Sequence, residues 1–398
     1  GIEKEKKEGE IVLEVINKLS KYKIKDKAGD FIGARMGRPE KAKLRKLTGS
    51  PNVLFPIGTE GGRLRSVNEA VNIGYVNSSF PNYYCNKCEK ESIYRVCEDC
   101  NEKTEKKYFC KLCNHEVKER CSLHDRADNF KETKLDMKHY FEKAVEKLGL
   151  TRYETPVLIK GIRGTSSESH SLENLSKGIL RAKHKLCVNK DGTVRYDMTE
   201  LVITHFKPKE IEVCVDKLKE LGYDKDYLGK ELENEEQILE LKPHDIIIPC
   251  NNRCGDDKAD DVFIRVANFI DELLIKLYGL PAFYNVKNRD DLIGKLGVCM
   301  APHNCAGVIS RIIGFSKVQG LLASPYMHAA MRRDADGDEA ALMLLADVLI
   351  NFSRKFLPAH RGGTQDAPLV LNGKIHAKEV DDQILDFEVA SNYPLDLY

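Results

Sequence analysis

Three aspartates in one short segment are the residues whose spacing most clearly suggests catalysis. They alternate in the segment MRRDADGDEAALMLL as Asp334, Asp336 and Asp338. A tightly turned backbone can place alternating carboxylates on one side, and Gly337 lets the chain bend closely around a bound ion. The segment also contains the arginines Arg332 and Arg333. Carboxylates hold divalent metal ions and arginines hold phosphates, so this mixture is typical of phosphoryl or nucleotidyl transfer.

Two other interpretations of the acidic segment compete with catalysis. A calcium-binding EF-hand also begins with alternating aspartates, but it requires glycine where this chain has Glu339 and a bidentate acid where it has Leu345. The second alternative is a solvated acidic turn that precedes a helix, since acidic residues favour helix N-termini. The apolar pattern after the loop predicts such a helix over residues 339–357.

Paired cysteines provide a second, independent signal. Seven of the thirteen cysteines lie between Cys85 and Cys121. They form two sets of four ligands at spacings typical of tetrahedral zinc: Cys85, Cys88, Cys97 and Cys100; Cys110, Cys113, Cys121 and His124. Each set predicts a closed structural zinc ribbon that stiffens a segment too small to bury its own core. His115 is an alternative ligand, but His124 occupies the knuckle position.

The remaining six cysteines give weaker signals. Cys250 and Cys254 are separated by three residues, and no partner pair follows at a suitable spacing, so we expect unligated thiols. The other four are expected to be small apolar residues of the interior: Cys187, Cys214, Cys299 and Cys305.

A basic, glycine-containing segment could contact phosphate. GARMGRPEKAK, residues 33–43, carries four cations: Arg35, Arg38, Lys41 and Lys43. It lacks the G-x4-G-K-[ST] pattern of nucleotide-binding P-loops, which removes the main support for an ATPase. A solvated basic loop is the default interpretation of such a segment alone. Together with an acidic metal loop, it suggests the opposite wall of a cleft.

Composition describes a folded protein of several compact units. The chain has 398 residues, of which 42% are hydrophobic and 31% charged, with a net charge of +1. We expect no membrane span, because no run of about 18 uncharged apolar residues occurs. The charged first residues do not resemble a secretory signal, and clustered cysteine pairs favour a reducing, cytoplasmic compartment. Apolar spacing predicts helices over residues 135–148 and 260–278, each followed by a glycine, and an apolar strand over NVLFPIG.

The order of several segments resembles one family along nearly the whole chain. These segments are GARMGRPEKAK, NVLFPIGTEGG, KGILRAKH, DGTVRYDMTE, THFKPKEI, APHNCAGVISRIIGF, HAAMRRDADGDEAALML and RGGTQDAPLVL. With the cysteine pairs, they make the chain similar to the catalytic core of the large subunit of archaeal D-family DNA polymerases.

The resemblance implies an α+β fold with two double-psi β-barrels. The expected division is a first barrel region with the basic loop at residues 1–80 and two zinc ribbons at 81–130. A KH-like α/β unit with the barrel's return follows at 131–215, a connector and helical segment at 216–282, and a second barrel region with the metal loop at 283–398.

The implied function is DNA-directed DNA polymerisation in replication, a nucleotidyl transfer that adds deoxynucleotides to a primer 3′-hydroxyl. By the same likeness, Asp336 and Asp338 would hold two catalytic magnesium ions, and the cysteine sets would hold two structural zinc ions. Phosphate or nucleic acid would contact a larger set: Arg35, Arg38, Lys41, Lys43, Arg332, Arg333 and His303. Implied partners are primer–template DNA, deoxynucleoside triphosphates, a small proofreading exonuclease subunit and a sliding clamp, with no membrane.

Two positions depart from the family pattern Asn-x-Asp-Gly-Asp-Glu-Asp. Asp334 replaces the asparagine, and Ala340 replaces the last acid. Asp334 could act as a third metal ligand or add repulsion. Two alternatives therefore accompany the polymerase hypothesis: an RNA polymerase of the same barrel type, and a non-catalytic, zinc-containing nucleic-acid-binding scaffold.

Overall fold

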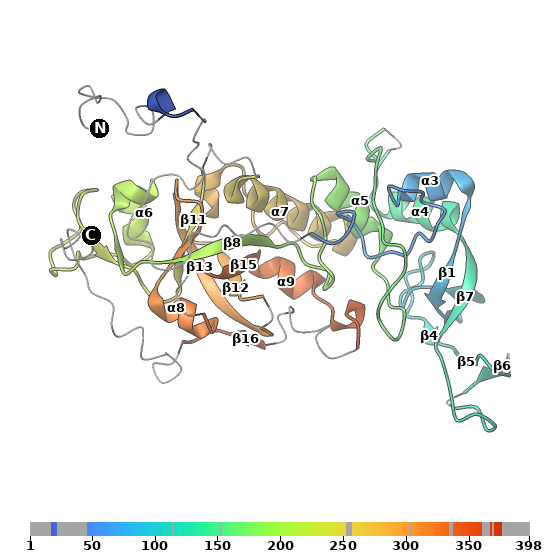
Figure 1. Ribbon diagram of the computed structural model, residues 1–398. Coiled ribbons are helices and arrows are strands. Elements are labelled where there is room, and N and C mark those ends of the chain that lie inside the picture. The colour runs from blue at the N-terminus through green and yellow to red at the C-terminus, as the bar shows by residue number, and fades with distance from the viewer. Residues whose placement is uncertain are drawn as a thin grey trace.

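The computed structural model describes residues 17–21, 46–113, 115–118, 120–151, 153–251, 257–302, 304–333, 337–359, 367 and 370–375. Figure 1 shows an elongated molecule with a β-barrel in one half and a smaller group of helices and short strands in the other. This arrangement is a mixed α+β fold, as the sequence predicts. In the described part of the chain, every helix is too short or too polar to cross a membrane.

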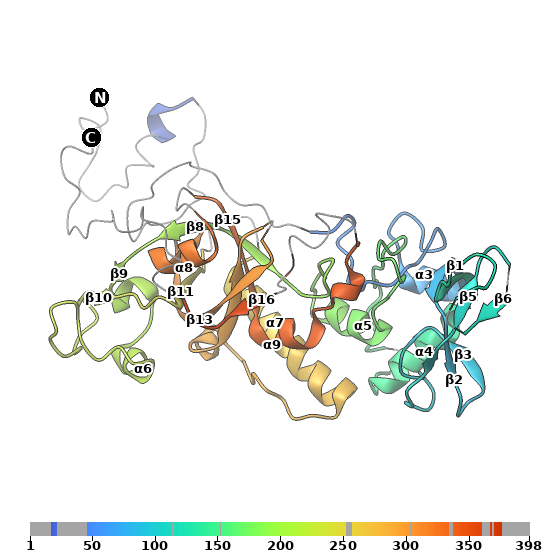
Figure 2. The ribbon, with the colours of Figure 1, turned by 90° about the horizontal axis from the view of Figure 1, so that it is seen from below.

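Six strands close into a barrel. They are β8 (Tyr196–Val202), β11 (Asp245–Pro249), β12 (Leu296–Met300), β13 (Ala306–Ser316), β14 (Leu321–Ala323) and β15 (Glu339–Leu344). The order is β11-β14-β8-β15-β12-β13, and parallel pairing of β11 with β13 closes the ring. The short strand β16 (Val370–Asn372) adds to the outer side of β13. Figure 2 shows the strands from below.

Strand β15 corrects the helix predicted over residues 339–357. It pairs with β8 on one side and β12 on the other, and the helix α9 begins only at Leu345 and ends at Asn351. All residues from Ala340 to Leu344 are buried. A strand buried on both faces is apolar at every position, so its sequence lacks the alternation that would distinguish it from a buried helix.

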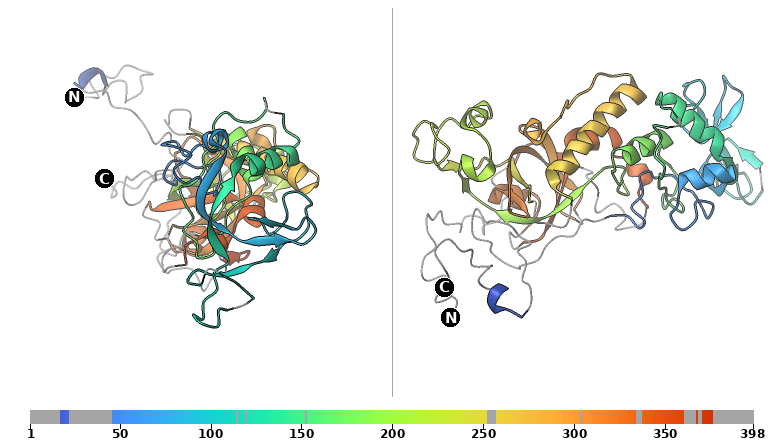
Figure 3. Two further views of the ribbon diagram at one scale, coloured as in Figure 1. Left: turned by 90° about the vertical axis from the view of Figure 1, so that its right-hand side faces the viewer. Right: turned by 90° about the horizontal axis from the view of Figure 1, so that it is seen from above.

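Helix α7 (Ala259–Leu273) covers one side of the barrel and confirms the helix predicted over 260–278. It continues as a π-helical turn, η2 (Leu274–Tyr278), and ends at Gly279, whose φ of 64° is left-handed. Its apolar face packs against β11, β15 and α9. The gold helix in Figure 3 (right) runs from the barrel toward α5 (Leu175–Lys183), which it contacts.

The smaller half is built on one antiparallel pair, β1 (Tyr75–Pro81) with β7 (Phe130–Asp136). Helix α3 (Val67–Ile73) precedes β1, and α4 (Met137–Lys147) follows β7 as predicted, with Gly149 at a φ of 59° after its end. The cysteine-rich insert lies between the paired strands. Its strands are β2 (Tyr83–Cys85), β3 (Lys90–Ser92), β4 (Glu105–Lys106), β5 (Tyr108–Cys110) and β6 (His115–Val117).

The segment NVLFPIG is buried but does not form the predicted strand. Its one bridge joins Pro56 to Ile162, and its other backbone hydrogen bonds form no continuous ladder. The remaining helices and strands are short. They are β9 (His205–Phe206), η1 (Pro208–Ile211), α6 (Val215–Glu220), β10 (Leu239–Glu240), η3 (Arg289–Leu292), α8 (Pro325–Ala330) and η4 (Arg354–Phe356). The expected division into five regions stays a prediction; the barrel takes β8 and β11 from outside residues 283–398.

A fully buried arginine connects segments that are distant in sequence. Both Arg181 Nη atoms donate to the Glu173 carboxylate, at 2.8 and 2.7 Å. The same guanidinium donates to the carbonyl oxygens of Asn52 and Gly192 and lies over the ring of Phe269. Glu173 also accepts from the Leu54 N–H. Because both charges are withdrawn from water, each depends on the other for compensation.

We therefore expect Arg181→Met to destabilise the chain by about 3–5 kcal/mol, the usual cost of leaving one member of a buried ion pair unpaired. Urea-induced unfolding followed by circular dichroism measures the change. The double variant Arg181→Met/Glu173→Gln removes the unpaired charge while keeping an acceptor for Leu54, so it should recover much of the loss. Equal instability of the two variants would contradict this account.

Candidate metal centres and the acidic loop

The first four predicted ligands converge on one point. Cys85 ends β2, Cys88 lies in the following turn, and the second knuckle supplies Cys97 and Cys100. Their sulfur atoms lie within 4.8 Å of one another, with Cys85–Cys100 at 3.5 Å and Cys88–Cys97 at 3.9 Å. Four sulfurs bound to tetrahedral zinc at about 2.3 Å would lie about 3.8 Å apart, so the donor set fits this ion.

The knuckle backbone favours a thiolate at Cys85, whereas the Cys100 sulfur raises the pKa of Cys88 and burial raises the pKa of Cys97. A hydrogen bond from the backbone N–H of Cys88 lowers the pKa of the Cys85 thiol to about 7. Left-handed residues follow both cysteine pairs, Glu89 at a φ of 51° and Asn101 at 59°. Before these residues, the N–H groups of Lys87 and Cys88 donate to Cys85, and those of Asp99 and Cys100 donate to Cys97.

The second set also converges. Cys110 ends β5, and the sulfurs of Cys113 and Cys121 lie 3.5 Å apart. His124 Nδ1 lies 3.0 Å from Cys113, 3.7 Å from Cys121 and 3.8 Å from Cys110. This set is also one that could hold a metal ion, and it contains His124 rather than His115.

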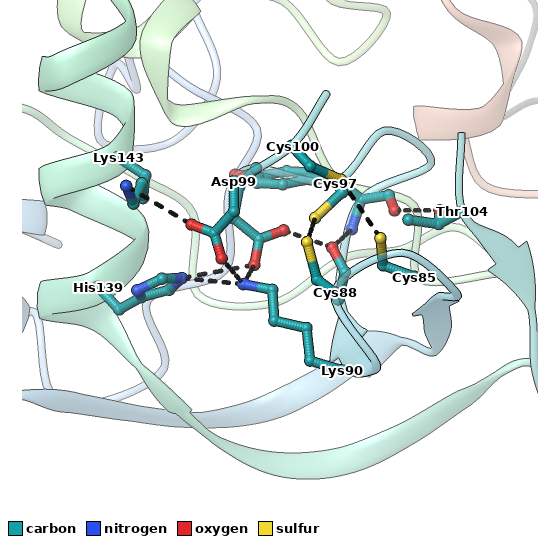
Figure 4. Close-up of polar contacts among 12 residues, drawn as sticks. Cys85, Cys88, Lys90, Cys97, Asp99, Cys100, Thr104, His139 and Lys143 are labelled. Atoms are coloured by element: carbon teal, nitrogen blue, oxygen red, sulfur yellow. Dashed lines mark hydrogen bonds and ion pairs between the residues drawn. The ribbon is translucent and has the colours of Figure 1, made fainter. Parts of the chain in front are cut away.

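Acidic residues between the second pair of cysteines attach the first cluster to helix α4 (Figure 4). Glu98 accepts hydrogen bonds from Lys90 at 2.7 Å and Ser92 at 2.6 Å, and Asp99 forms an ion pair with Lys90. From α4, His139 approaches Glu98 at 3.4 Å and Lys143 approaches Asp99 at 3.6 Å.

The charge of Lys90 occupies this acidic cluster. Partial burial disfavours its ammonium, but Asp99 and Glu98 outweigh burial and raise the pKa of Lys90. Glu98, Asp99 and His139 lie close enough together to hold a metal ion. Because Lys90 and Lys143 already pair with these acids, the cluster acts as an attachment of the ribbon to α4.

Asp338 lies immediately before β15 and directly after Gly337, whose φ is 96°. One carboxylate oxygen accepts a hydrogen bond from Arg333 Nη1 at 2.8 Å, and Arg333 Nη2 donates to the Pro302 carbonyl at 3.1 Å. The Asp338 side chain is 33% exposed. The arginine therefore orients a carboxylate that solvent and ligands can still reach.

The backbone of Asp338 is bound to strand β8 through Glu200. The Glu200 N–H donates to the Asp338 carbonyl at 2.8 Å, and the Glu200 carboxylate accepts from the Asp338 N–H at 3.4 Å. The other carboxylate oxygen lies 2.9 Å from Nδ1 of His328, on α8. Burial disfavours ionisation of Glu200, but the nearby His328 outweighs burial and lowers the pKa of this carboxyl.

Sequence reasoning did not assign Glu200 and His328 to the site. Both lie within segments that support the family resemblance, yet nothing in their spacing connects them. The sequence signal was weak, because β8 contains a second acid, Asp197, and both acids are buried. A buried carboxylate requires a partner, and spacing does not identify it. The structure supplies that partner, His328, from α8 and places the pair against the backbone of Asp338.

Several predicted site residues lie outside the described residues. They are Arg35, Arg38, Lys41, Lys43, His303, Asp334 and Asp336. Arg332 is described: it is exposed, with a left-handed φ of 59°. The structure therefore joins Asp338 to Arg333, while the relation of Asp338 to the other two aspartates stays a prediction.

The scattered cysteines differ in environment. Cys250 donates to Asp260 at 3.0 Å, and burial together with this acid raises the pKa of its thiol to about 11. Cys254 lies outside the described residues. Cys299 is buried as expected and Cys187 is partly buried, but Cys214 and Cys305 are exposed. The prediction of interior residues is wrong for these last two, since each lies in a loop before an element rather than within one.

Two family models match this chain. The catalytic domain of DNA polymerase II large subunit DP2 matches residues 152–398, and the central domain of the same subunit matches residues 2–119. The first match contains the barrel, Glu200 and Asp338, and the second contains the first cysteine cluster and part of the second.

Individual relatives agree with these matches. The DNA polymerase II large subunit of Nanoarchaeum equitans (strain Kin4-M) is 46% identical over 100% of this chain and 35% of its own length. That of Archaeoglobus fulgidus is 46% identical over 98% of the chain and 34% of its own length. That of Pyrococcus furiosus is 41% identical over 97% of the chain and 31% of its own length. The chain thus spans about a third of these relatives. It belongs to the DNA polymerase II large subunit family.

Proposed function

We propose that this chain carries the polymerising centre of a DNA-directed DNA polymerase that acts in replication. The observation that carries the proposal is the placement of Asp338: a partly exposed carboxylate, oriented by Arg333 and anchored to β8 by Glu200. The family match over residues 152–398, to a catalytic domain, supports the same assignment.

In the proposed reaction the primer 3′-hydroxyl attacks the α-phosphate of a deoxynucleoside triphosphate, and pyrophosphate leaves. Asp336 and Asp338 would hold magnesium, with Asp334 beside them, because Mg²⁺ prefers carboxylate oxygens. Two such ions, when bound, would supply charge neutralisation at the attacking and leaving oxygens. The bend at Gly337 and the exposed Asp338 carboxylate fit this use.

Phosphate recognition is proposed for the cations around the loop. Arg332 is exposed beside the acidic loop and can reach an incoming phosphate, whereas Arg333 acts on Asp338. The remaining proposed contacts come from Arg35, Arg38, Lys41, Lys43 and His303. Arginine binds phosphate through two parallel hydrogen bonds, which orients as well as attracts it.

The finer architecture is also part of the proposal. We assign the family to the archaeal D-family polymerases and the closed six-stranded barrel to one of two double-psi barrels. The second barrel would form around the basic segment. Partners proposed for the whole protein are primer–template DNA, deoxynucleoside triphosphates, a small proofreading exonuclease subunit and a sliding clamp.

Zinc is proposed as the ion of both cysteine clusters. Each cluster offers four soft or borderline donors and no open coordination position, so the ion would be structural. The short strands around the clusters bury few apolar residues, which makes their folding dependent on the ion.

The purified chain should therefore contain two equivalents of zinc by elemental analysis. Cys88→Ser and Cys113→Ser should each lose one equivalent, because serine is a poor zinc ligand, and each should lower the melting temperature. Cys214→Ser is the matched control, since this exposed thiol lies in neither cluster and its replacement should retain both ions. One equivalent or none in the unaltered chain would contradict two closed sites.

Asp338→Asn should lower deoxynucleotide incorporation by about 100-fold or more. Asparagine keeps the shape and one acceptor for Arg333, but it removes the charge that holds a divalent ion, whose electrostatic support is worth several kcal/mol. Primer extension with magnesium measures the loss. Affinity for primer–template DNA should be unchanged or higher, because a carboxylate repels nearby phosphates.

Asp334→Asn is the matched control for this experiment. It removes one charge from the same loop but restores the family's residue, so activity should persist. Near-normal extension by Asp338→Asn would show that catalysis occurs elsewhere and would support the scaffold hypothesis. Preferential incorporation of ribonucleotides would instead support the RNA polymerase alternative.

A further inference from the structure

A cleft lies at the junction between the smaller half and η4, apart from the acidic loop. Its volume is about 410 Å³, within the size range of small-molecule sites. One wall comes from the first ribbon, α4 and α5, and the other from the end of α7 and from η4. Asp338 and the other described residues of the acidic loop do not line it.

Cations from three helical elements and one loop line this cleft. They are Arg95 after β3, Lys147 at the end of α4, Lys177 on α5 and Lys355 on η4. Lys147 donates to the neutral Asn101 side chain, and Arg95 donates to the Tyr83 hydroxyl. Among the residues that the structure describes, none of the four forms an ion pair with a carboxylate. By contrast, the fifth cation of the lining, Lys143, is paired with Glu146 at 2.8 Å.

The acidic residues of the lining do not balance these cations. Glu98 is occupied by Lys90 at 2.7 Å, and Glu173 is occupied by the buried Arg181. Both neutralising cations come from outside the lining. The surface that faces the cleft therefore carries an excess of positive charge in the described part of the chain.

Lys355 shows the effect of this excess. Partial burial lowers its pKa, and the positive charges of Arg95 and Lys106 lower it further. These positive charges repel one another, which destabilises their charged forms. An anion bound between them would relieve the repulsion. Arg95 approaches from the ribbon and Lys355 from η4, so the two walls would share such a ligand.

Aromatic side chains accompany the cations. Tyr278, at the end of η2, is 45% exposed, and Lys177 Nζ lies 6.0 Å from its ring centre. Tyr94 and Phe356 contribute further ring surface to the lining. Exposed rings beside cations are the combination that binds unpaired bases by stacking while the cations follow the phosphates.

We propose that this cleft binds the phosphate groups of a single-stranded nucleic acid. The cations are spread over three helical elements and one loop, which suits the successive phosphates of a strand better than one small anion. A duplex keeps its bases stacked inside and would leave Tyr278 without a base, whereas a single strand exposes bases for stacking. The site goes beyond the proposed polymerising centre and does not depend on chemistry at Asp338.

The test is fluorescence anisotropy of a labelled oligothymidine of about 12 nucleotides, within the range covered by small single-strand-binding domains. The whole chain is titrated without added magnesium or nucleotides, over a series of salt concentrations. For Lys177→Ala/Lys355→Ala, the slope of log affinity against log salt should fall by about 1.4, which is about 0.7 for each lost phosphate contact. If the two chains bind equally at 1 M salt, the variant should bind about 25-fold more weakly than the unaltered chain at 0.1 M.

Two matched variants distinguish the charge of the cleft from effects on folding and from the total charge of the chain. Lys177→Arg/Lys355→Arg keeps the cations and should retain the slope. Lys138→Ala/Lys217→Ala removes the same total charge from exposed positions outside the lining, and it should leave affinity nearly unchanged. Tyr278→Ala should weaken oligothymidine binding several-fold without changing the salt slope, because stacking releases no counterions.

Several outcomes would overturn the proposal. An unchanged slope in Lys177→Ala/Lys355→Ala would show that the cleft makes no phosphate contacts. Equal loss of affinity for a duplex of the same length, with no effect of Tyr278→Ala, would assign the surface to duplex DNA. Inorganic phosphate or a mononucleotide that competes as strongly as the oligonucleotide would assign it to a small anion. Failure of primer extension leaves all these measurements interpretable, so the two proposals fail separately.

Discussion

The position of β15 between β8 and β12 is the constraint on which the barrel and the acidic loop both depend. Hydrogen bonds on both sides hold the strand, and every residue from Ala340 to Leu344 is buried, so a shift by one residue would disrupt both ladders at once. The register with β8 brings Asp338 next to Glu200. A side chain at the end of a doubly paired strand is held far more rigidly than one on a free loop, as a metal-binding carboxylate requires.

Buried charges recur where segments distant in sequence must meet. Arg181, paired with Glu173, also contacts Asn52, Gly192 and Phe269. His328 and Glu200 join α8 to β8 beside Asp338. Such pairs are costly to desolvate and stabilise only when their hydrogen bonds are made. They therefore select one arrangement of segments, because any other arrangement would leave a charge buried without a partner.

In the smaller half, the first cysteine cluster adds to an apolar core that includes Phe55, Phe80 and Met137. Glu98 and Asp99 lie between two of the cluster's ligands and bind Lys90, while His139 and Lys143 approach them from α4. An ion at this cluster would thus stabilise both the ribbon and its attachment to the helix. Tyr94 and Arg95 lie in the same ribbon, so the ion would also fix one wall of the basic cleft.

The sequence by itself determined the features that arise from local spacing. Paired cysteines predicted two four-ligand clusters, and apolar periodicity predicted α4 and α7 together with the glycines that follow them. These features can be predicted from the sequence because they depend on residues that lie close together along the chain. Tertiary structure decided the rest. The apolar segment after Asp338 forms a barrel strand because β8 and β12 pair with it on either side. Its apolar residues alone would fit a helix equally well. Glu200 and His328 act on the loop only because β8 and α8 meet there, and no spacing in the chain encodes that contact. Physical proximity created by strand pairing, rather than residue type, made them part of the site.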